Sequence, residues 1–172
     1  LELLKNNNSQ NVRELRADVL YKLALCQGQT QDYESAISTC KQLFAEFNYA
    51  ETPSIESSIA WGLFEYEYSL RMTKKFDESI NTFKQIHNRF NDTTSKDIKL
   101  AVSWAFAENG LSYKYTQDYH GAINIFNEVI ENYEKLPEGQ YGFSVSINKS
   151  ASDYSGVIAY TMTEKASCLR LL

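Results

Sequence analysis

The sequence predicts an all-α protein, folded as a solenoid in which antiparallel helix pairs stack side by side. Two observations support this prediction. Aromatic residues with the same surrounding pattern recur every 43 residues, at Tyr33, Phe76 and Tyr119. In addition, the 172 residues include only seven glycines and two prolines, so few positions interrupt a helix. A constant spacing of this length indicates repeated supersecondary units that stack to share one core.

Three segments that align without gaps, 32–47, 75–90 and 118–133, are predicted to be the second helix of each unit. After each opening aromatic, small or apolar residues recur at offsets that follow one face of an α-helix. The recurring residues are Ala36, Ser79 and Ala122, then Ile37, Ile80 and Ile123, then Cys40, Phe83 and Phe126, and last Leu43, Ile86 and Val129. We expect this face to be buried against a neighbouring helix.

Upstream of each second helix, residues 17–30, 60–73 and 103–116 align at the same spacing and predict a first helix. Apolar residues lie on more than one face of these segments, which suits a helix that packs on two sides. Turn-rich connectors separate the units. The predicted boundaries are about 12–47 for repeat one, about 55–90 for repeat two and about 98–133 for repeat three.

The periodicity stops after the third unit. Residues 134–152 are predicted to be an irregular insertion, in which the alternation over 141–147 indicates either a small strand or a loop that packs its aromatic side chains on a neighbouring helix. The register resumes if 13 residues are inserted, so residues 153–172 are predicted to be a further first helix.

The two ends of the chain predict that it is a piece of a longer protein. It begins at Leu1, and residues 168–172 are mostly apolar. A terminal repeat normally needs a polar outer face. The alternative, a natural C-terminal helix that closes the solenoid, remains open. In either case residues 1–172 are expected to form a single domain.

In these columns the chain resembles the tetratricopeptide repeat family, in a form with a period longer than the usual 34 residues. The family pattern has an aromatic residue at the start of the second helix, a small residue three positions later and another aromatic four positions further on. Tyr33, Phe76 and Tyr119 fit the first position, and Phe83 and Phe126 fit the last. The chain departs from the pattern at several positions: Cys40 replaces an aromatic, and Glu67 stands where a small first-helix residue is usual. Late in the second helix the usual small residue is replaced by Leu43, Ile86 and Val129, and the family's Pro at the end of the unit is missing.

The resemblance implies a right-handed superhelix of about three repeats plus one further helix, with the first helices lining its concave side. It also implies a protein or peptide ligand on that side. Carried over by register, the predicted partner-binding residues are Tyr21, Lys22, Trp61, Phe64, Glu65, Tyr68, Arg71, Trp104, Glu108, Leu111, Lys114 and Tyr115.

Two features of this predicted face allow a purely structural interpretation. Trp61 and Trp104 either wedge between repeats or face the ligand, because aromatic side chains dominate both cores and interfaces. Arg71 and Lys114 share one column, and the column of Glu65 and Glu108 precedes it; Glu164 joins the glutamate column in the resumed register. These charges either form a ladder between repeats, for example by pairing Glu65 with Lys114, or hold a peptide.

The composition and the motifs argue against catalysis and against several ligand classes. A net charge of −5 disfavours phosphate-backbone binding, so no nucleic-acid partner is expected. No apolar run is long enough for a membrane span, and no membrane partner is expected. The two histidines and three cysteines lack metal-ligand spacing and a catalytic partner, so no catalytic, cofactor or metal site is expected. The odd cysteine count favours a reducing compartment, and we expect a cytoplasmic protein.

The sequence therefore predicts a non-catalytic protein-interaction module, acting as a scaffold or sensor. The alternative hypothesis is a peptide-sensing or regulatory segment of a larger regulator or enzyme whose effector domain lies outside this chain. A third hypothesis is self-association through the apolar C-terminal helix. The three hypotheses differ in the partner that the repeats bind: a separate protein or peptide, a signal for an effector domain of the same protein, or a second copy of this chain.

Overall fold

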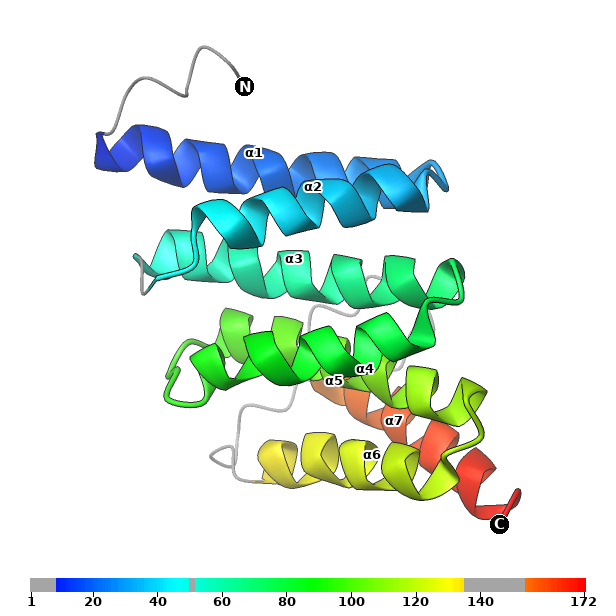
Figure 1. Cartoon of the computed structure of the whole chain (residues 1–172). Coiled ribbons are helices and arrows are strands. Elements are labelled where there is room, and N and C mark those ends of the chain that lie inside the picture. Colours follow the sequence, from blue (N-terminus) through cyan, green and yellow to red (C-terminus); the bar gives the residue numbers. More distant parts are fainter. Residues whose placement is uncertain (1–8, 50–51, 135–153) are drawn as a thin grey trace.

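The computed structural model describes residues 9–49, 52–134 and 154–172, and side chains within these ranges except 132–134, 154 and 155. Over these residues the chain forms seven α-helices and one short 3₁₀ helix, and no strand (Figure 1). Their bounds are α1 Gln10–Gln29, α2 Tyr33–Glu46, α3 Pro53–Met72, α4 Phe76–Ile86, η2 His87–Phe90, α5 Lys96–Tyr115, α6 Tyr119–Glu134 and α7 Tyr154–Leu169. The all-α fold class is confirmed. The predicted strand or loop at 141–147 lies outside the described residues.

The helices form two layers, as a helical-repeat solenoid requires (Figure 1). Helices α1, α3, α5 and α7 pack side by side in one layer, and α2, α4 and α6 pack against them. Each second helix contacts the first helix before it and the first helix after it. The first helices therefore supply the continuous layer to which the pairs are attached.

Each turn between a first and a second helix has the same geometry. Gln31, Lys74 and Gln117, 43 residues apart, have φ values of 64°, 60° and 65°, in the left-handed region. At each turn this residue donates its N–H to the carbonyl three positions earlier, and the next residue donates to the carbonyl five positions earlier. This pair of bonds is the Schellman arrangement, which satisfies carbonyls at a helix end. The repeat thus extends to backbone geometry, although no glycine occupies the position.

The core follows the repeat columns. Ala36, Ser79 and Ala122 are fully buried, as are Cys40, Phe83 and Phe126 to within 1%. One cluster of buried apolar side chains runs from Ala17 in α1 to Val157 in α7. Burial on both sides explains why the first helices carry apolar residues on more than one face.

His87, at the start of η2, packs against aromatic side chains. Its ring stacks on Phe83 at 4.9 Å between centroids and meets Phe106 edge-on at 5.3 Å. Its Nδ1 lies 2.9 Å from the Phe83 carbonyl oxygen. These contacts hold η2 against α5 and leave the imidazole in a structural role.

Candidate partner-binding face

The predicted binding residues lie on α1, α3 and α5, which pack side by side in the first-helix layer. They differ in accessibility. Lys22 and Tyr115 are exposed, and Tyr21, Trp61, Phe64, Tyr68, Arg71, Trp104 and Lys114 are half-buried. Glu65, Glu108 and Leu111 are buried, with at most 5% of their surface exposed. We call the half-buried and exposed members, together with Tyr160 of α7, the first-helix face.

Aromatic rings make a connected chain across this face. Phe64 contacts Trp61 at 6.2 Å, Tyr68 at 6.5 Å and Trp104 of the next first helix at 6.2 Å between centroids. Trp104 in turn meets Tyr160 at 5.9 Å. The chain therefore links α3, α5 and α7 through side chains that keep part of their surface exposed.

Sequence reasoning missed Tyr160, although the resumed register contained the signal. Counting back through the 13-residue insertion puts Tyr160 in the same column as Trp61 and Trp104. That column is thus aromatic in three successive first helices.

Trp61 lies on the first-helix face and also links two first helices. Its Nε1 donates a hydrogen bond of 3.0 Å to Oδ1 of Asp97, at the start of α5, and Ser57 donates to the other oxygen of the same carboxylate. These bonds join the N-terminal ends of α3 and α5. Near the other end of α3, Arg71 reaches Glu108 of α5, so the two helices run parallel.

The charged columns form a ladder of ion pairs between consecutive first helices. The Arg71 Nε lies 2.5 Å from Glu108 Oε2, and the two side chains keep 16% and 7% of their surface exposed. The Lys114 Nζ lies 2.7 Å from Glu164 Oε2 and donates to Ser167 Oγ at 3.0 Å. Each cation pairs with the glutamate of the following first helix. The pairing of Glu65 with Lys114 suggested by the sequence is therefore wrong, because Lys114 extends toward α7 and not back toward α3.

Glu65 occupies the glutamate column at the first interface, between α1 and α3, but its cation is missing. The column that holds Arg71 and Lys114 contains Gly28 in α1. A Cβ atom on Gly28 would lie 1.8 Å from Glu65 Oε1, so the carboxyl group rests directly against the glycine. Among the described residues, none forms an ion pair with Glu65; Ser69 Oγ donates to its Oε1 at 3.2 Å.

Burial raises the pKa of Glu65 to about 7; the Ser69 hydrogen bond opposes this rise, and the negative charge of Glu108 adds to it. Only 4% of the Glu65 surface is exposed, and its carboxyl group lacks a compensating cation. It is therefore partly protonated near neutral pH, unlike a carboxylate held by an arginine.

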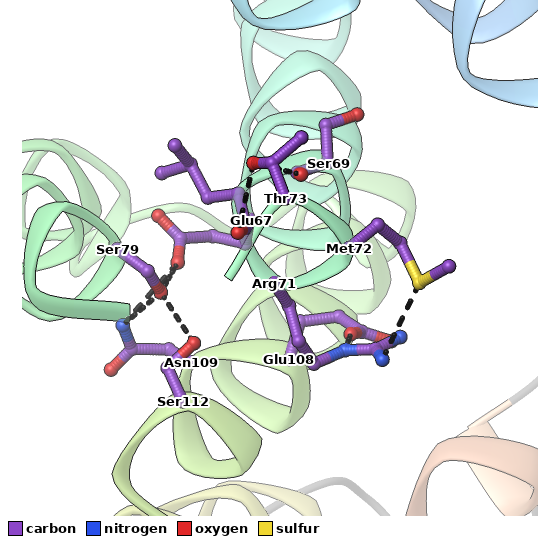
Figure 2. A network of polar contacts seen from close by, with 10 residues as sticks. Glu67, Ser69, Arg71, Met72, Thr73, Ser79, Glu108, Asn109 and Ser112 are labelled. Atoms are coloured by element: carbon purple, nitrogen blue, oxygen red, sulfur yellow. Dashed lines mark hydrogen bonds and ion pairs between the residues drawn. The ribbon is translucent and has the colours of Figure 1, made fainter. Parts of the chain in front are cut away.

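A second buried acid, Glu67, lies on a different side of α3 from the Arg71–Glu108 pair (Figure 2). Its Oε2 accepts hydrogen bonds from Ser79 Oγ of α4 at 2.5 Å and from Asn109 Nδ2 of α5 at 3.3 Å. Ser79 Oγ also lies 2.9 Å from Ser112 Oγ. Glu67 thus stands where a small residue is usual in this family, and its hydrogen bonds join α3, α4 and α5.

Complete burial raises the pKa of Glu67 to about 8, against the lowering effect of the Ser79 and Asn109 hydrogen bonds. Its Oε1 and the Asn109 Oδ1 are buried without a hydrogen-bond partner. Because Glu67 has no exposed surface, it acts on helix packing and not on a ligand.

The described residues contain no cluster of three or more His, Cys, Asp or Glu side chains able to hold a metal ion. Within the same part of the chain, no helix is both long and apolar enough to cross a bilayer. What the arrangement offers chemically is a polar and aromatic surface, built on closely packed helices.

The comparison with protein families agrees with this architecture. The model of the tetratricopeptide repeat matches residues 18–47, which cover most of α1 and all of α2, and residues 110–135, which include the end of α5 and all of α6. This match supports the assignment of the chain to the tetratricopeptide repeat family, as the sequence predicts. No curated protein and no solved structure matches the chain significantly. Tetratricopeptide repeats generally mediate protein–protein interaction, so proteins are the expected partners.

Proposed function

We propose that this protein is a non-catalytic interaction module that binds a peptide, or an extended segment of a partner protein, on the first-helix face. The observation that carries the proposal is the connected aromatic chain from Trp61 to Tyr160. Aromatic side chains are enriched in the central, energetically important parts of protein interfaces. Partly exposed rings, packed on one another and fixed to adjacent helices, lose little conformational freedom when a ligand covers them.

The direct contacts between first helices further support this choice of face. The second helices are spaced by the first helix that lies between them, whereas α1, α3, α5 and α7 touch one another in sequence. In a solenoid the more closely packed layer is the inner one, where an extended ligand can contact several repeats at once. The concave position of this face and the cytoplasmic location of the protein both stay predictions.

Site-specific photocrosslinking tests the proposal. A benzophenone amino acid replaces Lys22 or Tyr115, both exposed on the first-helix face, or Ser38 or Asn124, which are exposed on the second helices α2 and α6. After irradiation in an extract of the source cells, we expect the same discrete adduct from Lys22 and Tyr115 and none from Ser38 and Asn124. Adducts formed only at the second-helix positions would place the binding surface on the other layer and contradict the proposal.

A further inference from the structure

Helix α7 exposes a row of apolar side chains. Ala159, Met162, Ala166 and Leu169 follow one another at intervals of three or four residues, so they lie along one side of the helix, and we call them the α7 stripe. Ala159 and Ala166 are exposed, and Met162 and Leu169 keep 56% and 55% of their surface exposed. Helix α6 packs on another side of α7, around the buried Cys168. A contiguous apolar surface that stays exposed is typical of a protein–protein contact.

The earlier first helices bury the same positions. The ion pairs confirm the register, because the Lys114–Glu164 pair repeats the Arg71–Glu108 pair one first helix later. In this register the α7 stripe corresponds to residues of α1 and α3 whose exposed fraction is 0%: Ala17, Leu20 and Ala24, and Ala60, Leu63, Glu67 and Leu70. The α7 stripe is therefore the exposed counterpart of a surface that the other helix pairs cover.

The element that covers these positions is the second helix of the same pair. Two counterparts of Ala166 show this contact. On α3, Glu67 accepts a hydrogen bond of 2.5 Å from Ser79 of α4. On α5, a Cβ atom added to Gly110 would lie 2.4 Å from the Phe126 ring of α6. The structure thus shows what fits the α7 stripe, namely an α-helix that lies antiparallel to it.

The helix that fits best resembles α2. Helix α2 packs on Ala17, Leu20 and Ala24 of α1, and the α7 stripe differs from these residues only by Met162 in place of Leu20. An exchange of leucine for methionine conserves volume, so the same packing partner is tolerated. The side chains that α2 buries are small or of medium size: Ala36, Ile37, Thr39, Cys40 and Leu43.

Arg170 adds a requirement for charge. It directly follows the α7 stripe, is exposed, and stands in the column of Arg71 and Lys114. Those two cations each pair with a glutamate of the following first helix, whereas no residue that the structure describes forms an ion pair with Arg170. A helix placed like α2 begins near this end of α7, and α2 itself has Asp32 and Glu34 at its start. An acidic first turn therefore complements Arg170.

The charges disfavour a second copy of this chain on the α7 stripe. In an end-to-end stack, α1 of the second copy would follow α7 as the next first helix. The glutamate column, which pairs with the cation of the preceding first helix, contains Lys22 in α1. Lys22 would then face Arg170, and two like charges repel each other. The surface therefore suits a partner of different sequence.

We propose that the α7 stripe binds an amphipathic α-helix of a partner protein, antiparallel to α7, with an apolar side like that of α2 and an acidic first turn that reaches Arg170. The partner helix completes a further helix pair, in the way that α2 completes the first pair. This contact lies on a different surface from the first-helix face, so it does not rest on the proposed function.

The two methionines of the chain provide the readout. Met162 lies in the α7 stripe, and Met72, at the end of α3, keeps 40% of its surface exposed. The full chain, labelled with ¹³C at the methionine methyl groups, is titrated with a capped peptide of residues 32–47. The matched control peptide carries Ile37→Asp and Leu43→Asp. We expect the first peptide to shift the Met162 signal in a saturable way, to leave Met72 unchanged, and to bind about tenfold more tightly than the control.

Variants of the protein separate the apolar contact from the charge. Ala166→Glu places a charge in the α7 stripe and should weaken binding of the peptide about tenfold, whereas Ala45→Glu, the same change at an exposed position of α2, should not. Arg170→Glu should weaken binding about threefold, and Arg170→Lys should preserve it. Circular dichroism and an unchanged Met72 signal show that each variant is folded.

A Met162 signal that does not move at millimolar peptide, or that moves equally with the control peptide, would overturn the inference. Light scattering of the protein alone tests the other occupant: a dimer whose formation shifts the Met162 signal would place a second copy on the α7 stripe and also overturn it. Unchanged binding by the Arg170→Glu variant would contradict the acidic first turn assigned to the partner. Failure of the proposed function is seen independently, in crosslinks that form on the second-helix layer.

Discussion

The α1–α3 and α3–α5 interfaces are built from the same repeat columns, but they differ in whether the buried glutamate has a cation. Between α3 and α5, Arg71 neutralises Glu108, whereas between α1 and α3 the cation column holds Gly28 and Glu65 stays unpaired. A buried carboxylate with a cation stays ionised, and one without a cation gains a proton more easily. The same glutamate column therefore holds an ion pair at one interface and an acid of raised pKa at the other.

The difference also changes how each interface is held together. The Arg71–Glu108 pair and the Lys114–Glu164 pair join neighbouring first helices, and in each pair a cation neutralises the glutamate. At the α1–α3 interface Glu65 supplies the carboxylate, but Gly28 stands where the cation would be. Three substitutions test this comparison, beginning with the one expected to have the largest effect.

Glu108→Gln should lower the free energy of unfolding by about 3 kcal/mol, because it leaves the largely buried Arg71 guanidinium without a counter-charge. Urea denaturation at pH 7 measures the change. The double variant Arg71→Gln with Glu108→Gln should recover part of the loss, since no isolated charge remains. A change below about 0.5 kcal/mol for the single variant would show that the pair is no more than a surface contact.

Glu67→Gln tests the fully buried acid of α3, which belongs neither to the Arg71–Glu108 pair nor to the α1–α3 interface. The pKa of Glu67 is raised from its ordinary value of 4.5 to about 8, so the folded state binds the proton more tightly than the unfolded state. This group therefore favours folding at pH below about 4.5, and its contribution is lost as the pH rises toward 8. We expect Glu67→Gln to gain about 3 kcal/mol relative to the wild type between pH 5 and pH 7.5.

The measurement for Glu67 is the midpoint of urea unfolding at several pH values. Glu128→Gln, an exposed change on α6, is the matched control and should show no such pH trend. If the difference between the Glu67→Gln variant and the wild type is constant with pH, then Glu67 is ionised in the folded protein throughout this range.

Glu65→Gln should change the free energy of unfolding least, and it tests the comparison of the two interfaces most directly. The pKa of Glu65 is also raised, to about 7, so its contribution to stability falls as the pH rises from about 4.5 to 7. Relative to the wild type, the glutamine variant should gain about 2 kcal/mol at pH 8 over its value at pH 5. Thermal melts at both pH values give the difference. A loss of stability at pH 8 comparable to that of Glu108→Gln would mean that Glu65 is paired with a cation after all.

The sequence predicted the helix pairs because side-chain periodicity and local turns depend on residues that are close along the chain. The columns opened by Tyr33, Phe76 and Tyr119 identified the buried face of each second helix, and the structure buries Ala36 and Phe126 as expected. The left-handed residues at the three turns were not predicted, because Gln31, Lys74 and Gln117 are not residue types that indicate a positive φ.

The candidate face was predicted only as a set of positions on one side of each first helix. The register also placed the charged columns, but it suggested pairing Lys114 with Glu65. In the structure Lys114 pairs with Glu164 of the following first helix, α7. The aromatic continuation to Tyr160 depends on the same helix, whose register is interrupted in the sequence.

By itself, the sequence determined the repeat, the helix pairs and the side of each helix that is buried, because these follow from spacing along a single helix. Only the tertiary structure decided which carboxylate has a cation beside it. Ion pairing depends on distances of a few ångströms between helices, and those distances are set by the packing of whole side chains. Gly28 illustrates the point: in the sequence it is one small residue in a column, and in the structure it is the reason that Glu65 remains unpaired.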